Sequence, residues 1–520
     1  DVTGTPTLST VATTGAYSDL TGTPAAVVPG GSFEAVASGT LANGDKVIVN
    51  ADGTVSVVEI SNLPNTISSA TTVSSNTTHY MDSAFDSTTN KVVTVYARSG
   101  QAIYAVVGTV SGSSISFGSP ITVSSQGGYY PKVSFDSNSN KIVVTYDDKG
   151  NSYYGTSIVG TVSGTSISFG TPVVFTSERI RDTETIFDST SNKIIVGYTK
   201  EISFSTNGFI QIGTVSGTSI SFGTSVPLAS DMSIWGVSMA HDTNSNKIVV
   251  SYSDNTASTV VYSRVGTVSG NTISLGTAVA QNSTGNISNT KSTFDSNSNK
   301  VVIVRQEHGN VRISVIIGTV SGNSISFGSP VQLPQSPGAS APAFSQSKAI
   351  LFDPIENKIV LSYCDERNSN KITLIVGVVS GNTITFGPPL VMTTAGQPKA
   401  LVFDSNSNKA LIVYRDYDDS NKGKAVIVTS YSSTLANLTT ENFVGIADGS
   451  YASGATATIQ TSGSVDDAQS GLTAGQAYFL QEDGTIATTA DTTRVFAGVA
   501  LSATELMIGR DMSASSVVTY

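Results

Sequence analysis

Apolar and small polar residues alternate in short runs along most of the chain, which is the pattern of half-buried β-strands. In KIVVTY (141–146) and TSISFGTPVVF (165–175), Val, Ile, Thr, Tyr and Phe dominate, and these residue types are enriched in strands. Short clusters of Gly, Asn, Asp and Ser separate the runs, as expected for turns. The pattern therefore predicts an all-β protein.

One twelve-residue motif, written FDSNSNKIVVTY at 135–146, recurs seven times. Its first position is occupied in successive copies by Phe85, Phe135, Phe187, His241, Phe294, Phe352 and Phe403, with gaps of 50, 52, 54, 53, 58 and 51 residues. A period of about 50 residues is the signature of a propeller blade or of an array unit.

Each copy predicts four strands. In the second copy these are KVSFD, KIVVTY, TSIVGTVSG and TSISFGTPVVF, and the third and fourth are joined by a short glycine-containing hairpin. Seven such units fit a seven-bladed β-propeller, while an open β solenoid is the competing layout. Closure of the ring distinguishes the two.

The seventh copy lacks its fourth strand, because the chain leaves the pattern after KAVIVTSY. A matching strand lies before the first copy, where NTISSATTV (65–73) closely resembles NTISLGTAV (271–279) of the fourth copy. We expect 65–73 to pair with 424–431 and close the ring, since closure removes exposed strand edges. The expected fold is an all-β, seven-bladed propeller of four-stranded blades closed by an N-terminal strand.

A weaker repeat flanks the propeller: FEAVASGTLANGDKVIV (33–49) resembles FVGIADGSYASGATATI (443–459), and 496–508 echoes its opening. We interpret these segments as one small β domain into which the propeller is inserted. The expected organisation is an extended connector (1–31), the first part of the small domain (32–62), the propeller (63–440), and the second part of the small domain with the C-terminal tail (441–520).

The amino-acid composition argues against several classes of partner and site. Only 12% of residues are charged and the formal net charge is −11, with no concentration of basic residues, which argues against a nucleic-acid partner. The single cysteine, Cys364, excludes an intramolecular disulfide framework and a multi-cysteine zinc site. No apolar run approaches the roughly 18–20 residues of a membrane-spanning helix, so we expect no membrane insertion. Because residue 1 is Asp, we expect a processed or trimmed chain.

The acidic cluster of the motif has two interpretations. Asp-x-Asn-x-Asn resembles the first half of a calcium loop, yet the turn glycine and the distal glutamate of such a loop do not follow. The alternative is a hairpin in which Asp and Asn side chains bind local backbone amides. We favour the turn and keep weak calcium binding as the alternative, so no metal site and no cofactor are predicted.

Catalytic candidates are few. His79, His241 and His308 lie far apart in the sequence, and His241 occupies the phenylalanine position of the motif. The adjacent pairs Asp147/Asp148 and Asp418/Asp419 could serve glycoside hydrolysis, but we interpret them as solvated charges on exposed loops. The Asp-box pattern of sialidases is absent from the sequence. The sequence thus predicts a protein that is not an enzyme.

Loops of two kinds alternate along each copy. Those between strands one and two and between strands three and four are near-copies, whereas those between strands two and three and between successive copies vary. In a propeller the two kinds lie on opposite faces, so partner binding is assigned to the variable one. Its aromatic and charged side chains suit stacking on sugars or anchoring a protein, although packing on a neighbouring blade is the alternative for each aromatic residue. The candidate ligand-binding residues are Tyr129, Tyr130, Tyr153, Tyr154, Trp235, Arg367 and Tyr417.

The two ends of the chain resemble tailed-phage fibre and related virion appendage proteins. STVATTGAYSDLTGTP (9–24) is similar to connector segments of phage tail fibres, and GLTAGQAYFLQEDGTI with FAGVALSATELMI (471–508) resembles small β modules of phage structural proteins. The resemblance covers about 100 of the 520 residues and includes no catalytic motif.

This resemblance implies a non-enzymatic, extracellular virion subunit that contacts other virion structural proteins. The propeller loops would bind a host-surface glycan or protein, and a homotrimer is expected because such fibres are usually trimers. A secreted or surface-attached bacterial adhesin or lectin is one alternative. A polysaccharide depolymerase is another, and it would need carboxylates converging on one face.

Overall fold

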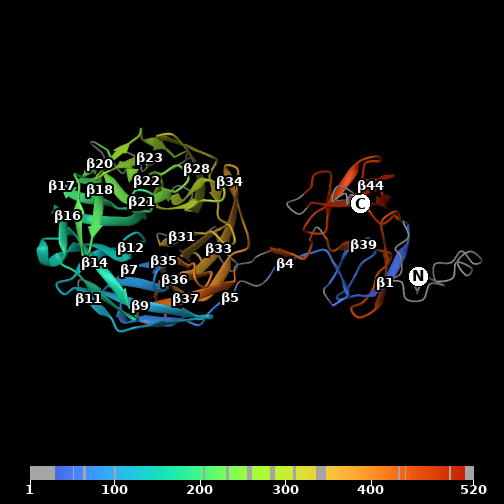
Figure 1. The fold of residues 1–520 in the computed structure, drawn as a ribbon, viewed down its shortest axis with the longest axis horizontal. Coiled ribbons are helices and arrows are strands. Elements are labelled where there is room, and N and C mark those ends of the chain that lie inside the picture. The colour runs from blue at the N-terminus through green and yellow to red at the C-terminus, as the bar shows by residue number, and fades with distance from the viewer. Residues whose placement is uncertain are drawn as a thin grey trace, which may run out of the picture. The chain divides into compact units, whose positions relative to one another are not determined.

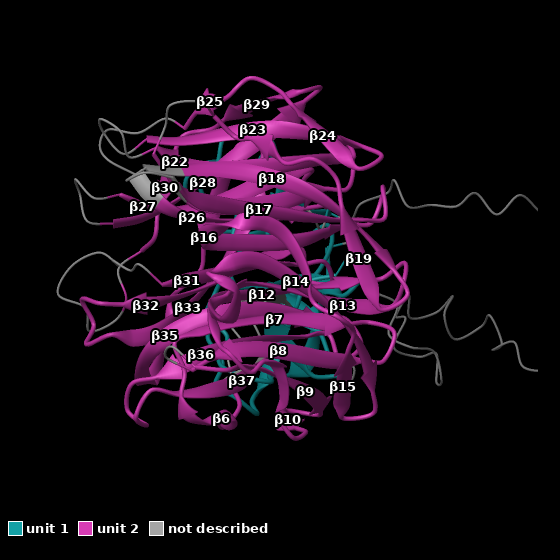
Figure 2. Ribbon diagram, turned by 90° about the vertical axis from the view of Figure 1, so that its left-hand side faces the viewer, with its two compact units in different colours: residues 1–63, 433–520 teal, residues 64–432 magenta. Residues whose placement is uncertain are grey.

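The computed structural model describes residues 30–50, 52–62, 66–98, 101–202, 205–229, 233–254, 260–281, 287–307, 312–334, 336, 347–430, 434–439, 441–490 and 494–509. Within these residues the protein is all-β, and a single-turn 3₁₀ helix, η2 (Lys149–Asn151), is the helical element described. The chain divides into two compact units, Asp1–Leu63 with Ser433–Tyr520, and Pro64–Ser432. We call the first the small β unit and the second the propeller-like unit (Figure 2). The sequence placed the corresponding boundaries at 62/63 and 440/441.

Each copy of the motif builds an antiparallel sheet in chain order. In the second copy, β12 (Gly128–Asp136) pairs with β13 (Lys141–Asp148), and β13 pairs with β14 (Tyr154–Ser163). The outer edge of β14 is covered by β15 (Ser166–Phe169) and by the first part of β16 (Val173–Asp188). The fourth strand expected from the sequence is therefore made of two shorter pieces.

The remaining copies repeat this order. The first copy comprises β7 (Tyr80–Asp86), β8 (Lys91–Ala97), β9 (Ile103–Ser111), β10 (Ser114–Phe117) and β11 (Ile121–Ser124). The third comprises the rest of β16, β17 (Lys193–Ile202), β18 (Ser205–Ser216), β19 (Ser219–Phe222) and β20 (Val226–Pro227). The fourth comprises β21 (Ile234–Asp242), β22 (Lys247–Asp254), β23 (Val260–Ser269), β24 (Thr272–Leu275) and β25 (Val279–Ala280). The fifth comprises β26 (Ile287–Asp295), β27 (Lys300–Glu307), β28 (Arg312–Ser321), β29 (Ser324–Phe327) and β30 (Val331–Gln332). The sixth comprises β31 (Lys348–Asp353), β32 (Lys358–Asp365), β33 (Lys371–Ser380), β34 (Thr383–Phe386) and the first part of β35 (Leu390–Asp404).

The first strand of each copy lies on the inside of the unit, and these inner strands contact one another in a closed cycle. The cycle runs β7, β12, β16, β21, β26, β31, β35 and back to β7. Figure 1 shows the sheets arranged around a common centre, and the architecture is propeller-like.

The seventh copy obtains its outer strand from the N-terminal side. It contains the rest of β35, β36 (Lys409–Asp416) and β37 (Lys422–Ser430). The free edge of β37 pairs with β5 (Thr66–Ile67) and β6 (Thr71–Thr77), with Val428 opposite Ile67 and Ala425 opposite Thr71. This is the pairing that the match between 65–73 and 271–279 predicts, and it brings the two ends of the unit into one sheet.

The acidic cluster of the motif is a turn. In the second copy, Oδ1 of Asp136 accepts hydrogen bonds from the backbone amides of Asn138 and Ser139, at 2.9 and 3.0 Å, and Oδ2 accepts one from the Ser139 hydroxyl at 2.7 Å. Asn140 then has a φ of 54°, a left-handed conformation that asparagine tolerates. The same amide contacts recur at Asp86, Asp188, Asp242, Asp295, Asp353 and Asp404. The structure thus shows the predicted turn in each copy, with the Asp carboxylate accepting backbone amides of its own turn.

In the third, fourth and fifth copies the lysine after the turn joins neighbouring copies. Lys193 Nζ donates to Thr214 Oγ1 at 2.7 Å within its own copy and to Asn271 Oδ1 of the next copy at 3.2 Å. Lys247 and Lys300 make the equivalent bonds to Asn323 and Asn382. In these three copies, the motif lysine and the SGN hairpin of the following copy therefore meet at a junction between sheets.

Large side chains at the end of the motif fill the space between sheets. Six tyrosines and one arginine occupy this position, and all are at most 1% exposed: Tyr96, Tyr146, Tyr198, Tyr252, Arg305, Tyr363 and Tyr414. Arg305 makes hydrogen bonds to Ser314, Gln281 and Glu307, which compensates the burial of its charge. Its role is therefore structural.

The small β unit interleaves strands from both ends of the chain. One sheet has the order β1 (Ser32–Val36), β40 (Thr456–Gln460), β39 (Phe443–Ala447), β2 (Lys46–Val49) and β3 (Val55–Val57). A second sheet contains β41 (Val465–Asp466), β45 (Leu506–Ile508), β44 (Val495–Ala500), β42 (Ala477–Leu480) and β43 (Ile486–Ala487). In addition, β4 (Ile60–Asn62) pairs with β38 (Thr434–Ala436). Strands that precede the propeller-like unit in the chain therefore pair with strands that follow it.

Candidate functional site

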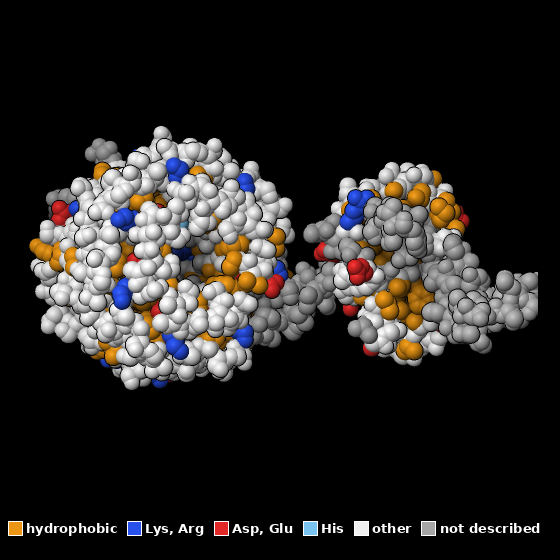
Figure 3. Space-filling model, in the orientation of Figure 1, with side chains coloured by type: hydrophobic (Ala, Val, Ile, Leu, Met, Phe, Trp, Pro, Cys, Tyr) orange, Lys and Arg blue, Asp and Glu red, His pale blue; other side chains and the backbone are white. Residues whose placement is uncertain are grey.

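Strand order assigns the described turns and strand ends of the propeller-like unit to one of two ends. The Asp turns and the short hairpins, such as 163–166, lie at one end, which we call the uniform face. The loops between second and third strands and the starts of the inner strands lie at the other end, which we call the variable face. Figure 3 shows Lys and Arg side chains spaced around this unit and a hollow at its centre.

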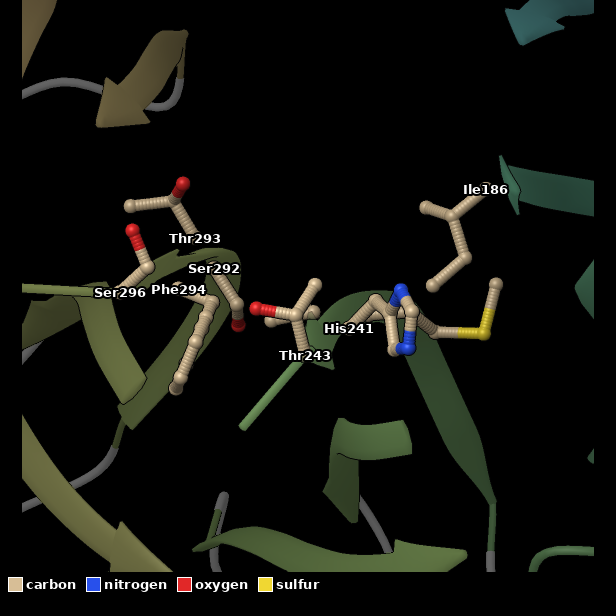
Figure 4. Close-up of a pocket in the computed structure, with 9 residues that line it drawn as sticks. Ile186, His241, Thr243, Ser292, Thr293, Phe294 and Ser296 are labelled. Atoms are coloured by element: carbon tan, nitrogen blue, oxygen red, sulfur yellow. The ribbon is translucent and has the colours of Figure 1, made fainter. Parts of the chain in front are cut away.

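One cavity lies at the uniform end of the inner strands, with a volume of about 380 Å³. Figure 4 shows His241 beside Thr243, with Ile186 on one side and Phe294 and Ser296 on the other. His241 Nε2 lies 3.1 Å from Asp188 Oδ1, a carboxylate oxygen that already accepts two amide hydrogens of its turn. Burial lowers the pKa of His241, although Asp188 opposes the shift. The lining of this cavity includes His241 and Phe294, which occupy the first position of the motif in the fourth and fifth copies.

A second cavity, of about 160 Å³, lies at the variable face, where the inner strands begin. We call it the mouth cavity. Six inner strands contribute to its lining, which combines aromatic rings, prolines and four lysines. The residues are Tyr80, Met81, Tyr130, Pro131, Lys132, Asp182, Asn289, Lys291, Ser347, Lys348, Pro398 and Lys399.

On one side of the mouth cavity the charges are paired. Glu184 Oε2 accepts from Lys132 Nζ at 3.1 Å and from Lys291 Nζ at 2.8 Å. Burial alone would raise the pKa of Glu184, but the two ammonium groups outweigh burial and lower that pKa to about 2. Glu184 therefore stays ionised and neutralises part of the lysine charge.

On the other side two lysines lack a carboxylate partner in the described part of the chain. Lys348 is 4% exposed, and no described residue accepts a hydrogen bond from its Nζ. Lys399 Nζ donates to the amide oxygen of Gln397 at 2.8 Å. Burial lowers the pKa of Lys348 to about 7 and that of Lys399 to about 8. Two buried lysines without a carboxylate partner among the described residues therefore lie on β31 and β35.

Aromatic side chains form a cluster next to this cavity. Tyr129 stacks on Tyr153 with ring centroids 6.2 Å apart, and Tyr80 lies 4.7 Å from Tyr130 and 5.9 Å from Tyr129. The guanidinium of Arg179 lies over the Tyr153 ring at 4.7 Å. All four tyrosine side chains are half-buried. The structure thus brings together three of the residues predicted from the sequence and adds Tyr80.

The structure places the other four predicted residues at or near the ends of strands. Tyr154 begins β14 and is opposite Arg179 in the β14–β16 ladder, and Trp235 lies on β21 opposite Ser253. Arg367 is in the β32–β33 turn, where its amide donates to Asp365 Oδ1. Tyr417 follows β36, with the Arg415 guanidinium 5.5 Å from its ring centroid.

The lysines of the mouth cavity were not among the residues predicted from the sequence. The prediction was based on the loops, whereas Lys132, Lys291, Lys348 and Lys399 lie on the inner strands. The sequence does contain a sign of these charged residues. In six copies a charged residue lies three or four positions before the motif, in a strand of otherwise apolar or small residues. The residues are Asp82, Lys132, Glu184, Lys291, Lys348 and Lys399.

The expectation that Asp147 and Asp148 are solvated loop charges is wrong for Asp147. It lies on β13, is 3% exposed, and its Oδ1 accepts a hydrogen bond from the Tyr129 amide. Burial raises the pKa of Asp147 to about 7, while this amide and Arg179 oppose the shift. The sequence alone did not indicate that Asp147 is buried, because its partner Tyr129 belongs to another strand.

The raised pKa of Asp147 should make the free energy of unfolding fall as the pH rises. Between its ordinary pKa of about 3.8 and the folded value of about 7, the folded state holds a proton that the unfolded state has lost. Asp147→Asn should remove this slope and leave the Tyr129 amide an oxygen acceptor. Denaturant unfolding at pH 4, 6 and 8 measures the slope, and Asp418→Asn, at an exposed position, is the control. An unchanged slope in the Asp147 variant would contradict the assignment.

Cys364 and His79 have pKa values that are shifted by burial. Burial raises the pKa of the Cys364 thiol to about 12, which keeps it protonated. Burial together with Arg415 and Lys399 lowers the pKa of His79. No group of three or more His, Cys, Asp or Glu that could hold a metal occurs in the described residues, and His308 lies outside them.

Comparisons with known proteins do not assign a family. No family model and no curated protein matches the chain. A crystal structure of a protein from Lactobacillus plantarum is similar over 68% of this chain and 95% of that one, with 9% sequence identity and a TM-score of 0.41. In the described part of the chain no helix has the length and apolar character needed to cross a membrane.

Proposed function

We propose that this chain is a non-enzymatic fibre or appendage subunit of a virion, with a seven-bladed propeller that binds a host-surface glycan or protein through its variable face. The observation that carries the proposal is the tyrosine cluster beside the mouth cavity, formed by Tyr80, Tyr129, Tyr130 and Tyr153. Half-buried aromatic rings at a concave, polar-lined surface suit stacking on sugars and serve as binding hot spots.

The contrast between the two faces supports this choice. On the uniform face the polar side chains are used within the unit: Asp carboxylates bind turn amides, and Lys193, Lys247 and Lys300 bind the next copy. Packing alone accounts for that face. The variable face instead combines aromatic rings with cationic groups that no described carboxylate neutralises.

The virion assignment depends on the two ends of the chain, which resemble tail-fibre segments. We propose that the small β unit connects the propeller to other virion structural proteins, that the assembly is a homotrimer, and that the protein acts outside the cell. Detection of the protein in purified virions supports this assignment. Detection in bacterial envelopes instead favours an adhesin or lectin, and release of reducing ends from host capsule favours a depolymerase.

Removing aromatic rings from the variable face should weaken attachment to host cells. Replacing Tyr153 and Tyr154 together by alanine, or Trp235 by alanine, is expected to cost about 2 kcal/mol of binding free energy, which is the usual size for a hot spot. The measurement is binding of labelled protein to host cells over a concentration series. Ser166→Ala, in an exposed hairpin of the uniform face, is the control. Equal losses from the two faces, or none from the variable face, would overturn the assignment.

A further inference from the structure

The mouth cavity contains a buried lysine amine with no counter-ion in the described structure. Lys348 is 4% exposed, and its Nζ has no hydrogen-bond partner among the described residues. Burying an unpaired ammonium group is costly, and proteins normally pair such a group with a carboxylate. Here the charged group whose field acts most on Lys348 is another cation, Lys291.

The acidic residues nearby are engaged elsewhere. Glu184 binds Lys132 and Lys291 at 3.1 and 2.8 Å. Asp182 also lines the cavity, and its carboxylate accepts a hydrogen bond from the Val237 amide. Burial raises the pKa of Asp182, so the carboxyl is a weak counter-ion. Lys348 and Lys399, on the neighbouring strands β31 and β35, thus form a cationic half of the cavity.

The rest of the lining is apolar and aromatic. Tyr80 and Tyr130 lie 4.7 Å apart by ring centroid, and Pro131 and Pro398 complete the wall. The volume of about 160 Å³ corresponds to roughly five water molecules. Ring faces beside buried ammonium groups match a ligand that has both a flat apolar surface and a negative charge.

We propose that the mouth cavity binds the carboxylate-bearing ring of an acidic sugar, with Lys348 and Lys399 as counter-ions and Tyr80 and Tyr130 against the ring. This inference rests on the proposed function and names the class of glycan that the variable face recognises. A purely neutral glycan would leave Lys348 without a counter-ion.

Proton uptake should accompany binding. Because burial lowers the pKa of Lys348 to about 7, much of this lysine is neutral at pH 8, and a bound carboxylate would favour its protonated form. The charged and titratable groups that line the cavity around Lys348 are Tyr80, Tyr130, Lys132, Asp182, Lys291 and Lys399.

The test uses the full chain and isothermal titration calorimetry with glucuronate and N-acetylneuraminate. Glucose and the methyl ester of each acid are the neutral controls, and inorganic phosphate tests for a general anion site. We expect at least one free acid to bind at least 10-fold more tightly than its ester and than phosphate. At pH 8 the heat should depend on the buffer's ionisation enthalpy, which reports proton uptake without any variant.

Substitutions then locate the site. Lys348→Met should weaken binding of the acid at least 10-fold, and Lys399→Met supplies a second, independent variant. Lys149→Met removes the same charge from an exposed position and should leave affinity within twofold. Absence of binding by both acids at millimolar concentration, equal affinity for acid and ester, equal affinity for phosphate, or no effect of either cavity variant would each overturn the inference.

Host attachment is measured separately with the same variants. If Lys348→Met abolishes sugar binding but cells are still bound, the site exists and the receptor is recognised elsewhere on the variable face. If no sugar binds but the tyrosine variants lose attachment, the inference fails and the proposed function remains. The two failures are therefore distinguishable.

Discussion

Replacing Val73 by aspartate should lower the free energy of unfolding of the propeller-like unit by about 3 kcal/mol or more. Val73 is 4% exposed on β6, the strand supplied from the N-terminal side. It packs in a cluster that joins the first and seventh copies and includes Met81, Tyr96 and Val413. Burying a carboxylate there removes apolar contact and adds the cost of an unpaired charge.

The matched control is Ser75→Asp, an exposed position on the same strand. It introduces the same charge without entering the core, so surface effects should keep the change within about 0.5 kcal/mol. Urea unfolding followed by tryptophan or tyrosine fluorescence gives both values. Similar stability for the two variants would show that β6 does not hold the ring closed.

Replacing Gly223 by alanine should also destabilise the unit, by roughly 1–3 kcal/mol. Gly223 follows the SISF strand of the third copy, and a methyl group placed there would overlap the carbonyl oxygen of Asn271 in the hairpin of the fourth copy. Since that oxygen belongs to the backbone, the two sheets must separate to make room. This separation would also weaken the hydrogen bonds from Lys193 and Thr214 to Asn271.

The sixth copy provides the control. Gly387 occupies the same place in the repeat, but the nearest heavy atom to an added methyl would be the Val376 oxygen, at 3.8 Å. The seventh copy takes its outer strand from β5 and β6 and so presents no equivalent hairpin there. Gly387→Ala should therefore change stability little in the same denaturation experiment. An equal loss at both glycines would place the cause within the sheet and not at the junction.

Local patterns predicted most of the secondary structure. The alternation in KIVVTY, the Asp-Asn turn before it and the hairpin glycine each act over a few residues, so the sequence shows them directly. The match between 65–73 and 271–279 carried the prediction further, to the pairing of β37 with β5 and β6, because a repeated unit reveals which of its parts is missing. The split of the fourth strand into pieces such as β15 and β16 was not predicted, since it depends on register shifts against β14.

The candidate site was predicted less completely. Loop variability and aromatic content identified Tyr129, Tyr130 and Tyr153, which the structure brings together. The same reasoning treated Asp147 as a loop charge, because burial by residues from other segments leaves no local signal. Tyr154, Trp235, Arg367 and Tyr417 share the loop pattern, but Tyr154 and Trp235 lie within strands, Arg367 lies in the β32–β33 turn and Tyr417 follows β36.

The sequence by itself determined the all-β class, the repeat, the turn role of the Asp clusters and the pairing that joins the ends of the propeller-like unit. Each follows from periodicity or from comparison between copies within the chain. Only the tertiary structure decided that Lys132 and Lys291 share Glu184 while Lys348 has no described partner. These residues are separated by 50 residues or more in the chain, and which charges are neutralised depends on distances across the ring that no single copy of the repeat encodes.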